Sequence, residues 1–428
     1  MSVKDRLSTA MQMGAFGAFL ALERVQTGVA FNPMRRGFRV NPYPTYRRLQ
    51  EKDPFHLSRA INGWVLTRHA DISAVLRDPR FSSDGRKVPR FKKMMEQRIA
   101  AGDLTREEAE GQSMLGLDPP DHTRLRSLVS KAFTPRSVEA LRPRVEQLVD
   151  EMVEHAAAKG TFDVIREIAY PLPVIIIAEM LGIPPDDREQ FKHWSDEMAL
   201  SVGMANVDEQ RRARDAQRAF REYMIPILEE RRREPREDLI SALVAAEAEG
   251  DKLSLQEVNS TIGLILVAGN ETTTNLIGNG LLALLQHRDQ FDRLRAQPEM
   301  IGTATEELLR YDSPVQGTSR NVLEDTEFNG HRVKAGQQLL LMIGAANRDP
   351  EQYKDPDALD IGGQDNKHLS FGNGMHFCLG APLARIEGPA ALNALAQRFP
   401  NIRLATDKLD WGDNIVLRGL RSLPVRVD

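Results

Sequence analysis

The stretch Phe371-Gly-Asn-Gly374-Met-His-Phe-Cys378-Leu-Gly380 decides the fold, and it contains the only cysteine of the 428-residue chain. An amphipathic segment typical of a helix follows it directly. A sulfur at a helix N-terminus is held anionic by the helix dipole and by unpaired N–H groups, and a thiolate is a strong electron-donating iron ligand. Gly374 allows a tight bend, and Gly380 lets the backbone approach the sulfur. The alternative, a buried cysteine acting as a small apolar residue, does not require a loop framed by glycines.

Composition excludes several classes of protein. The chain has 41% hydrophobic residues and can bury a sizeable core. Its 57 basic and 61 acidic residues give a net charge of −4, which does not suit nucleic acid. One cysteine excludes internal disulfides and multi-cysteine metal sites, and it fits a reducing cytoplasm. Any transition metal is therefore expected to be bound as part of a cofactor.

The N-terminal region requires a separate reading, because residues 10–22 are mostly apolar and follow Lys4 and Arg6. The segment is too short for a membrane-spanning helix and lacks a convincing cleavage site for a signal peptide. We predict that residues 1–40 form an extension, ordered in part, with an interfacial membrane helix as the alternative. Residues 41–428 are expected to form a single domain without a transmembrane anchor.

The rest of the chain is predicted to be mainly α-helical with small β-sheets, an α+β pattern. Residues 120–310 read mostly as helices, and strand signals lie on either side. Asn62-Gly63 and Asn329-Gly330 are typical of hairpin turns, the first leading into the strand Trp64-Val65-Leu66.

The longest predicted helix begins after Ser254, where Ser254-x-x-Glu257 forms a capping box, and it continues to about Gln286. It is apolar on nearly all sides, which indicates a central position. In its middle, Ala268-Gly-Asn-Glu-Thr-Thr273 is expected to interrupt the helix. A buried acid beside a hydroxyl group is costly unless it is used or satisfied. The alternative is a kink in which Thr272 bonds back to the preceding turn.

These segments resemble the cytochrome P450 family, soluble bacterial type. The cysteine segment fills every fixed position of the haem-binding loop, Phe-x-x-Gly-x-x-x-Cys-x-Gly. The central segment matches the oxygen-binding motif Ala/Gly-Gly-x-Asp/Glu-Thr, and the resemblance extends over roughly residues 40–428. It implies a P450 fold with haem b between the long central helix and the helix of the cysteine loop. It also implies insertion of one oxygen atom of O2 into a hydrophobic small molecule, by hydroxylation or epoxidation.

The resemblance assigns roles to individual residues. Glu271 is expected to relay protons from water, and Thr272 to hydrogen-bond dioxygen within a widened helix groove. Cys378 is the expected iron ligand. Cofactor binding is expected of His122, Arg126, Ala268, Gly269, Arg320, Phe371, Gly374, His376, Cys378 and Gly380, of which His122, Arg126, Arg320 and His376 would hold the two propionates. The expected substrate pocket includes Leu264, Val267, Ala268, Val315 and Leu417, with loops in 83–114 and 190–210 as further walls.

Glu307 and Arg310 stand three residues apart and resemble the Glu-x-x-Arg pair of the family, which is buried and structural. The family usually adds a third, arginine partner from a later segment. This chain has Ala358 at that place, and Lys354 is the candidate substitute.

No flavin or ferredoxin domain is recognised, so the resemblance implies separate redox partners: a ferredoxin with its reductase, or a flavodoxin-type donor. Arg124 and Lys131 are expected to face an acidic donor on the proximal side. Two other classes remain open. A peroxygenase would not need Glu271 and Thr272, and a haem-binding sensor or carrier would need no proton relay.

Overall fold

The computed structural model describes residues 16–59, 61–102, 104–106, 113–203, 206–248, 251–364 and 366–427. Residues 1–15 of the predicted extension, and parts of the predicted pocket walls 83–114 and 190–210, lie outside this range. The helices are α2 (Arg36–Val40), α3 (Tyr43–Lys52), α4 (His69–Val75), α5 (Pro89–Ala100), α7 (Asp121–Ala132), α8 (Pro135–Glu139), α9 (Arg142–Ala157), α10 (Pro171–Met180), α11 (Arg188–Ala199), α12 (Val207–Arg233), α13 (Leu239–Ala245), α14 (Leu255–Gln286), α15 (Arg288–Ala296), α16 (Ile301–Tyr311), α17 (Ile343–Ala346) and α18 (Ala381–Arg398).

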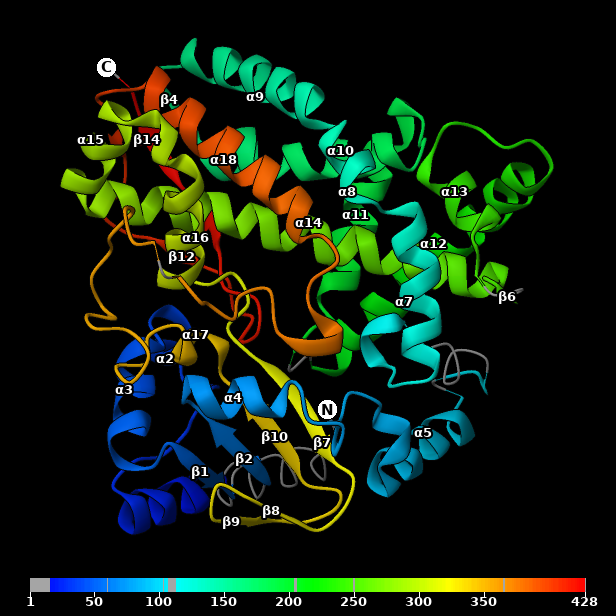
Figure 1. Cartoon of the computed structure of the whole chain (residues 1–428), viewed down its shortest axis with the longest axis vertical. Helices are drawn as coiled ribbons and strands as arrows, with labels where there is room; N and C mark the ends of the chain where they lie inside the picture. The colour runs from blue at the N-terminus through cyan, green and yellow to red at the C-terminus, as the bar shows by residue number, and fades with distance from the viewer. Residues whose placement is uncertain are drawn as a thin grey trace, which may run out of the picture.

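The main β-sheet has five strands in the order β1-β2-β10-β7-β3 and lies to one side of the helices (Figure 1). Only β2 and β10 pair in parallel within it. Its strands are β1 (Phe55–Ser58), β2 (Gly63–Leu66), β3 (Phe81–Ser82), β7 (Thr318–Val322) and β10 (Gln338–Leu341). The smaller sheets use β4 (Thr161–Asp163), β11 (Arg403–Leu404) and β14 (Pro424–Arg426), and the pairs β5 (Glu247–Ala248) with β6 (Asp251–Lys252), β8 (Thr326–Phe328) with β9 (His331–Val333), and β12 (Asp410–Trp411) with β13 (Leu420–Ser422). The α+β prediction is confirmed.

Both predicted hairpins form, but only one has the predicted two-residue turn. Asn329 and Gly330 have φ of 49° and 78° and link β8 directly to β9. At the other hairpin, Gly63 pairs with Ser58 and is already part of β2, so the loop is longer than predicted. A Cβ at Gly63 would come within 2.7 Å of the Gln338 carbonyl oxygen on β10, so this glycine serves the close approach of two strands.

Helix α14 crosses the middle of the molecule and spans about 48 Å (Figure 1). It starts at the predicted capping box: Ser254 Oγ accepts from the Glu257 N–H at 3.1 Å, and Glu257 accepts from the Ser254 N–H at 2.8 Å. The predicted interruption at residues 268–273 is wrong, since the helix runs unbroken from Leu255 to Gln286. The Thr272 hydroxyl donates to the Ala268 carbonyl oxygen at 2.7 Å and so stays within the regular helix.

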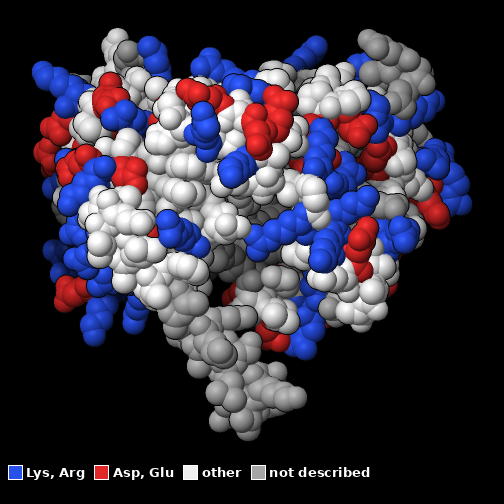
Figure 2. Space-filling view, turned by 90° about the horizontal axis from the view of Figure 1, so that it is seen from below, with Lys and Arg blue, Asp and Glu red and all other residues white. Residues whose placement is uncertain are grey.

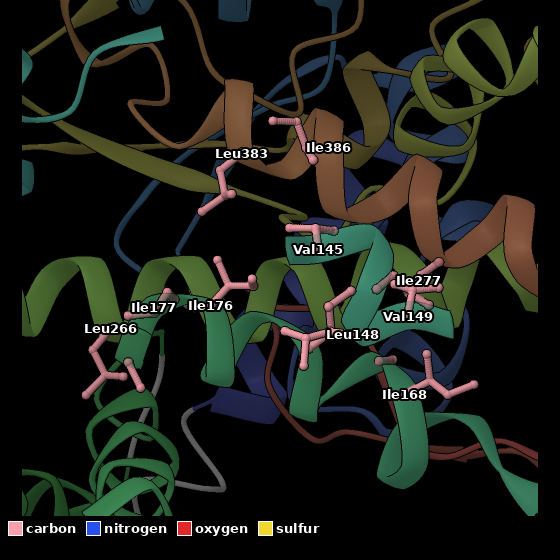
Figure 3. Close-up of a cluster of buried hydrophobic side chains, with 14 of the residues drawn as sticks. Val145, Leu148, Val149, Ile168, Ile176, Ile177, Leu266, Ile277, Leu383 and Ile386 are labelled. Carbon is pink, nitrogen blue, oxygen red and sulfur yellow. The ribbon is translucent and has the colours of Figure 1, made fainter. Parts of the chain in front are cut away.

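The main hydrophobic core surrounds this helix. Helices α10, α16 and α18 pack against α14, and α9 packs against α18. Figure 3 shows part of this core, where side chains from five elements meet: Val145, Leu148, Val149, Ile168, Ile176, Ile177, Leu266, Ile277, Leu383 and Ile386. Every residue of α14 from Thr273 to Leu284 is buried, which explains why this half of the helix is apolar on nearly all sides.

The N-terminal part of the described chain is tied to the sheet. Val29, Phe31 and Phe38 are buried in a small core with Tyr46 and Leu49 of α3. Residues 29–38 of the predicted extension therefore pack as part of the globular unit. Among the described helices, none combines the length and apolarity needed to cross a bilayer.

Candidate functional site

The cysteine loop has the bend that its glycines predict. Gly374 has a φ of +68°, and a Cβ there would come within 2.6 Å of the Leu76 carbonyl oxygen. The Cys378 N–H donates to the Phe371 carbonyl oxygen at 2.9 Å and closes the loop. Helix α18 begins three residues after the cysteine, at Ala381. The half-buried sulfur therefore sits at the entrance of a long helix, as predicted.

Several effects act in opposite directions on the pKa of the Cys378 thiol. Burial raises the pKa of the Cys378 thiol, while N–H groups of Gly380 and Ala381 and the charges of Arg126 and Arg385 lower it. Burial is the largest of these effects. A bound cation that replaces the thiol proton would favour the thiolate further, because a metal ligand must be deprotonated.

Four basic side chains, all predicted to hold propionates, come together beside the loop. His122 and Arg126 lie on α7, Arg320 on β7 and His376 in the cysteine loop. The rings of His122 and His376 are 4.2 Å apart. Both ring nitrogens of His122 and Nε2 of His376 are buried without a hydrogen-bond partner in the described part of the chain. Orphaned donors of this kind mark the place of a missing partner.

The charge of this cluster also fits an anionic group. Burial, followed by the charges of Arg320 and His122, lowers the pKa of His376 to about 4. Burial lowers the pKa of Arg320 to about 10. The nearby acid, Asp118, already bonds to the Ser83 N–H at 2.9 Å and to Lys87 at 2.9 Å. Two carboxylates would relieve this uncompensated positive charge, so these residues fit the haem that the sequence resemblance implies.

The acid and alcohol of the central motif lie on α14. Glu271 is half-buried, and its Oε2 is buried without a partner among the residues that the structure describes. Burial, followed by the negative charge of Asp196, raises the pKa of Glu271. Ala268 is exposed one turn before Thr272, which leaves open space at this point of the helix. Gly269 instead faces α10: a Cβ there would come within 2.8 Å of the terminal methyl group of Ile177, so this glycine allows close packing of the two helices.

The predicted pocket residues come from three segments. Leu264 and Val267 are half-buried on α14, at a spacing that places them on one face with Ala268. Val315 and Leu417 are 102 residues apart, yet they form a β-bridge with each other. The structure therefore brings the two non-helical pocket residues together.

The Glu-x-x-Arg pair is buried as predicted. Arg310 donates to Glu307 at 2.7 and 2.8 Å, and to carbonyl oxygens of Asn347, Pro356 and Ala358. Lys354, the candidate third partner, is exposed instead. The Asp360 N–H and the Asn366 side-chain amide donate to Glu307, both at 3.0 Å. Neutral donors thus complete the network where the family uses an arginine.

Two residues that make structural contacts in the region of the site, Arg385 and Asn366, were not predicted from the sequence. Arg385 lies 4.6 Å over the Phe371 ring and bonds to Glu306 at 2.7 Å, so it fixes the loop to α16. Its position on the first turns of the helix after the cysteine was the available signal. Asn366 had no such signal, because 59 residues separate it from Glu307.

Comparison with known proteins supports the same reading. The chain matches the family profile described as Cytochrome P450 over residues 90–408. It is 43% identical over 406 residues to the polyketide biosynthesis cytochrome P450 PksS of Bacillus subtilis, covering 92% of this chain and 98% of that protein. It is 39% identical over 422 residues to the cytochrome P450 monooxygenase PikC of Streptomyces venezuelae, covering 95% and 97%. The structure of P450BioI in complex with an acyl carrier protein ligated to hexadec-9Z-enoic acid matches with a TM-score of 0.84 and 37% identity, covering 92% and 99%. With this family profile, these relatives and the matching cysteine loop, the chain belongs to the cytochrome P450 family and is a haem b monooxygenase.

Proposed function

We propose that this monooxygenase oxidises a hydrophobic acyl or polyketide chain, and that Cys378 would ligate the haem iron. The observation that carries the cofactor placement is the cluster of His122, Arg126, Arg320 and His376 beside the cysteine loop, in which both ring nitrogens of His122 and Nε2 of His376 are buried without a hydrogen-bond partner among the described residues. These four side chains would hold the two propionates. Bound haem supplies the activation of O2 and the insertion of one oxygen atom into the substrate.

In this proposal Glu271 donates protons, and Thr272 donates a hydrogen bond to dioxygen. The raised pKa of Glu271 means that its carboxyl group keeps a proton to a higher pH than a solvated glutamate. It can therefore donate a proton near the operating pH. The Thr272 hydroxyl currently donates to the Ala268 carbonyl oxygen, so its own oxygen still offers lone pairs to the open space beside Ala268. Donation to dioxygen requires the hydroxyl to exchange this bond, which rotation about χ1 allows.

The proposed substrate class follows from the apolar residues of the proposed pocket and from the names of two similar cytochrome P450 proteins. Leu264, Val267, Val315 and Leu417 are apolar and would give the proposed pocket apolar walls. One relative is named for polyketide biosynthesis, and another was solved with an acyl chain on its carrier protein. On the face shown in Figure 2, a band of Lys and Arg side chains crosses the centre and right of the view, and positive charge of this kind would favour the approach of an anionic substrate or carrier.

Electrons are proposed to come from a separate ferredoxin or flavodoxin-type protein in the cytoplasm. Met375 and Phe377 of the cysteine loop are exposed and offer an apolar centre for docking. Arg124 forms an ion pair with Glu257, so its charge is already compensated. Lys131 is exposed on the same helix. Lys131→Glu should slow reduction by an acidic ferredoxin without changing substrate affinity.

The test of substrate class is the spin state of the purified ferric protein, followed by absorbance. A free long-chain acid, the same acyl chain on an acyl carrier protein, a polyketide lactone and a steroid are titrated in parallel. A shift from low to high spin with the acyl or polyketide ligands, and not with the steroid, supports the proposal. A shift with the steroid alone overturns the substrate class.

Turnover assays then test the chemistry. With a surrogate ferredoxin, its reductase and O2, the protein should form product, and Thr272→Ala should divert electrons to hydrogen peroxide. Efficient turnover with peroxide alone, unaffected by Thr272→Ala, would instead identify a peroxygenase. Cys378→Ser should abolish the thiolate-type spectrum, and retention of that spectrum would contradict the ligand assignment.

A further inference from the structure

Helix α5 carries four basic side chains that have no acidic partner. Arg90, Lys92, Lys93 and Arg98 stand against a single acid, Glu96, so the net charge of the helix is +3. None of the four forms a side-chain hydrogen bond or an ion pair among the residues that the structure describes. Their charge is therefore available to an external partner.

The basic residues directly before α5 are neutralised instead. Arg86 pairs with Asp84 at 2.7 Å, and Lys87 pairs with Asp118 at 2.9 Å. The whole chain has a net charge of −4. The positive charge of α5 is thus a local departure from both its neighbours and the molecule as a whole.

One face of α5 points to solvent along its length. Its residues are Arg90, Lys93, Met94 and Gln97, which are all exposed and follow helical spacing. Met94 is 42% exposed and is the only large apolar side chain of this outer face, so the face lacks the apolar stripe with which a helix enters a lipid bilayer. A single apolar residue within basic surroundings suits a polar protein partner.

The helix is attached to the molecule by its other face. Phe91, Met95 and Ile99 are half-buried, and none of the residues of α5 is fully buried. A Cβ at Gly85 would come within 3.2 Å of the Phe91 ring, so the helix packs closely on the 3-10 turn Gly85–Lys87. Figure 1 shows α5 at the edge of the molecule, which leaves its outer face accessible.

Helix α5 also begins beside the candidate site. Ser83 and Lys87 line a cavity of about 130 Å³ together with Arg320 and His376, two members of the basic cluster. Only Val88 separates Lys87 from the start of α5. A partner on the outer face would therefore lie near the site that it serves.

We propose that the outer face of α5 docks an acidic carrier protein, which presents the acyl or polyketide chain on its phosphopantetheine arm. This rests on the proposed function, because it names the partner that delivers the proposed substrate. The acidic surface of such a carrier and the phosphodiester of its arm are opposite in sign to α5. Docking makes and breaks no covalent bond, and the chain stays attached to the carrier through its thioester.

The test compares one acyl chain in two forms. The haem-loaded ferric protein is titrated with the chain on a carrier protein and with the same chain as its pantetheine thioester, which is neutral and has no protein attached. The change from low to high spin reports binding. Arg90→Glu with Lys93→Glu should weaken binding of the carrier-bound chain by roughly tenfold or more and leave binding of the pantetheine thioester unchanged. Added salt should weaken binding of the carrier-bound chain in wild type more than in this double variant.

The matched control reverses two exposed charges elsewhere. Arg398→Glu with Arg426→Glu makes the same change of net charge on α18 and β14, which lie away from α5 in Figure 1. It should leave both affinities unchanged. An equal loss in the control variant would reduce the effect to net charge and overturn the proposal.

Three further outcomes would also overturn it. Equal weakening of both ligands would show that α5 shapes the substrate pocket. Slower reduction by a ferredoxin, with unchanged affinity for the carrier-bound chain, would assign the face to the electron donor. Binding of the wild type to vesicles of anionic lipid, lost in Arg90→Glu with Lys93→Glu, would assign it to a membrane surface.

Failure of the docking proposal and failure of the proposed function are distinguishable. If the pantetheine thioester shifts the spin state but charge reversal on α5 does not change the affinity for the carrier-bound chain, the docking face is wrong and the substrate class stands. If neither acyl ligand shifts the spin state and a steroid does, the substrate class fails, and the docking proposal fails with it.

Discussion

At the scale of single residues, the pair of Glu307 and Arg310 shows two ionised groups that are buried and are each satisfied by several hydrogen bonds. Glu307 and Arg310 are 5% and 4% exposed. The guanidinium group of Arg310 makes five hydrogen bonds, two of them to Glu307. Two neutral N–H donors also bind the carboxylate of Glu307. Removing one member leaves the other charged, buried and unpaired, which costs far more than the pair contributes.

Glu307→Gln is therefore expected to lower the free energy of unfolding by about 3–5 kcal/mol and to speed haem loss. Denaturant unfolding of the haem-loaded protein measures the first effect. Glu139→Gln is the matched control, because Glu139 and Arg142 have the same three-residue spacing on exposed helix surface. It should leave stability within experimental error. Equal losses in both variants would contradict the structural role of Glu307.

At the scale of elements, a buried histidine fastens the N-terminal helical residues 16–27 to β1. His56 is completely buried, with Nδ1 2.8 Å from Asp53 and Nε2 3.2 Å from Glu23. Ser58 also donates to Glu23, at 2.9 Å. Burial lowers the pKa of His56, but the bonds and charges of Asp53 and Glu23 outweigh it, and the pKa is raised above 6.5. Only the protonated ring can donate to both carboxylates.

Because folding raises this pKa, the stabilisation is fully present below about pH 6.5 and is lost as pH rises through the folded value. His56→Gln should therefore reduce hydrogen-exchange protection of residues 16–27 more at pH 6 than at pH 8.5, each compared with wild type at the same pH. Ser58→Ala is the control: it removes a bond to Glu23 without a titrating group, so its effect should be equal at both pH values. A His56→Gln effect that does not depend on pH would count against this fastening.

At the scale of the whole molecule, the basic cluster joins regions that are distant in sequence. Helix α7, strand β7 of the main sheet and the cysteine loop each contribute to it. Without an anion, Arg320 is a buried cation that opposes folding, as the lowering of its pKa to about 10 shows. With propionates bound, the same side chain links sheet and helices through the cofactor, which stabilises the native state by mass action.

Arg320→Gln is therefore expected to stabilise the haem-free protein and to weaken haem binding by roughly tenfold or more, as for loss of a charged hydrogen bond. Thermal unfolding of the haem-free protein and the rate of haem transfer to a scavenger protein measure the two effects. Arg332→Gln, on the exposed side of β9 outside the cluster, should change neither. A haem transfer rate equal to wild type would remove Arg320 from the set of propionate ligands.

The sequence predicted features whose cause is local. The bend at Gly374, the capping box of Ser254 and Glu257 and the hairpin at Asn329-Gly330 each depend on a few neighbouring residues. A cysteine before a helix and an acid next to a threonine were recognisable for the same reason. From these the family and the α+β fold could be predicted.

Other features depend on atoms brought together from far along the chain, and only the tertiary structure decided them. The backbone of Asp360 and the amide of Asn366 replace the expected arginine at Glu307, and no short-range pattern encodes that contact. Helix α14 remains regular where its sequence suggested a break, and helices α10, α16 and α18 pack against it. Gly269 proved to serve packing against Ile177. Local sequence determines bends, caps and reactive side chains, whereas burial and partners, and with them the pKa of each group, are set by what the fold places around it.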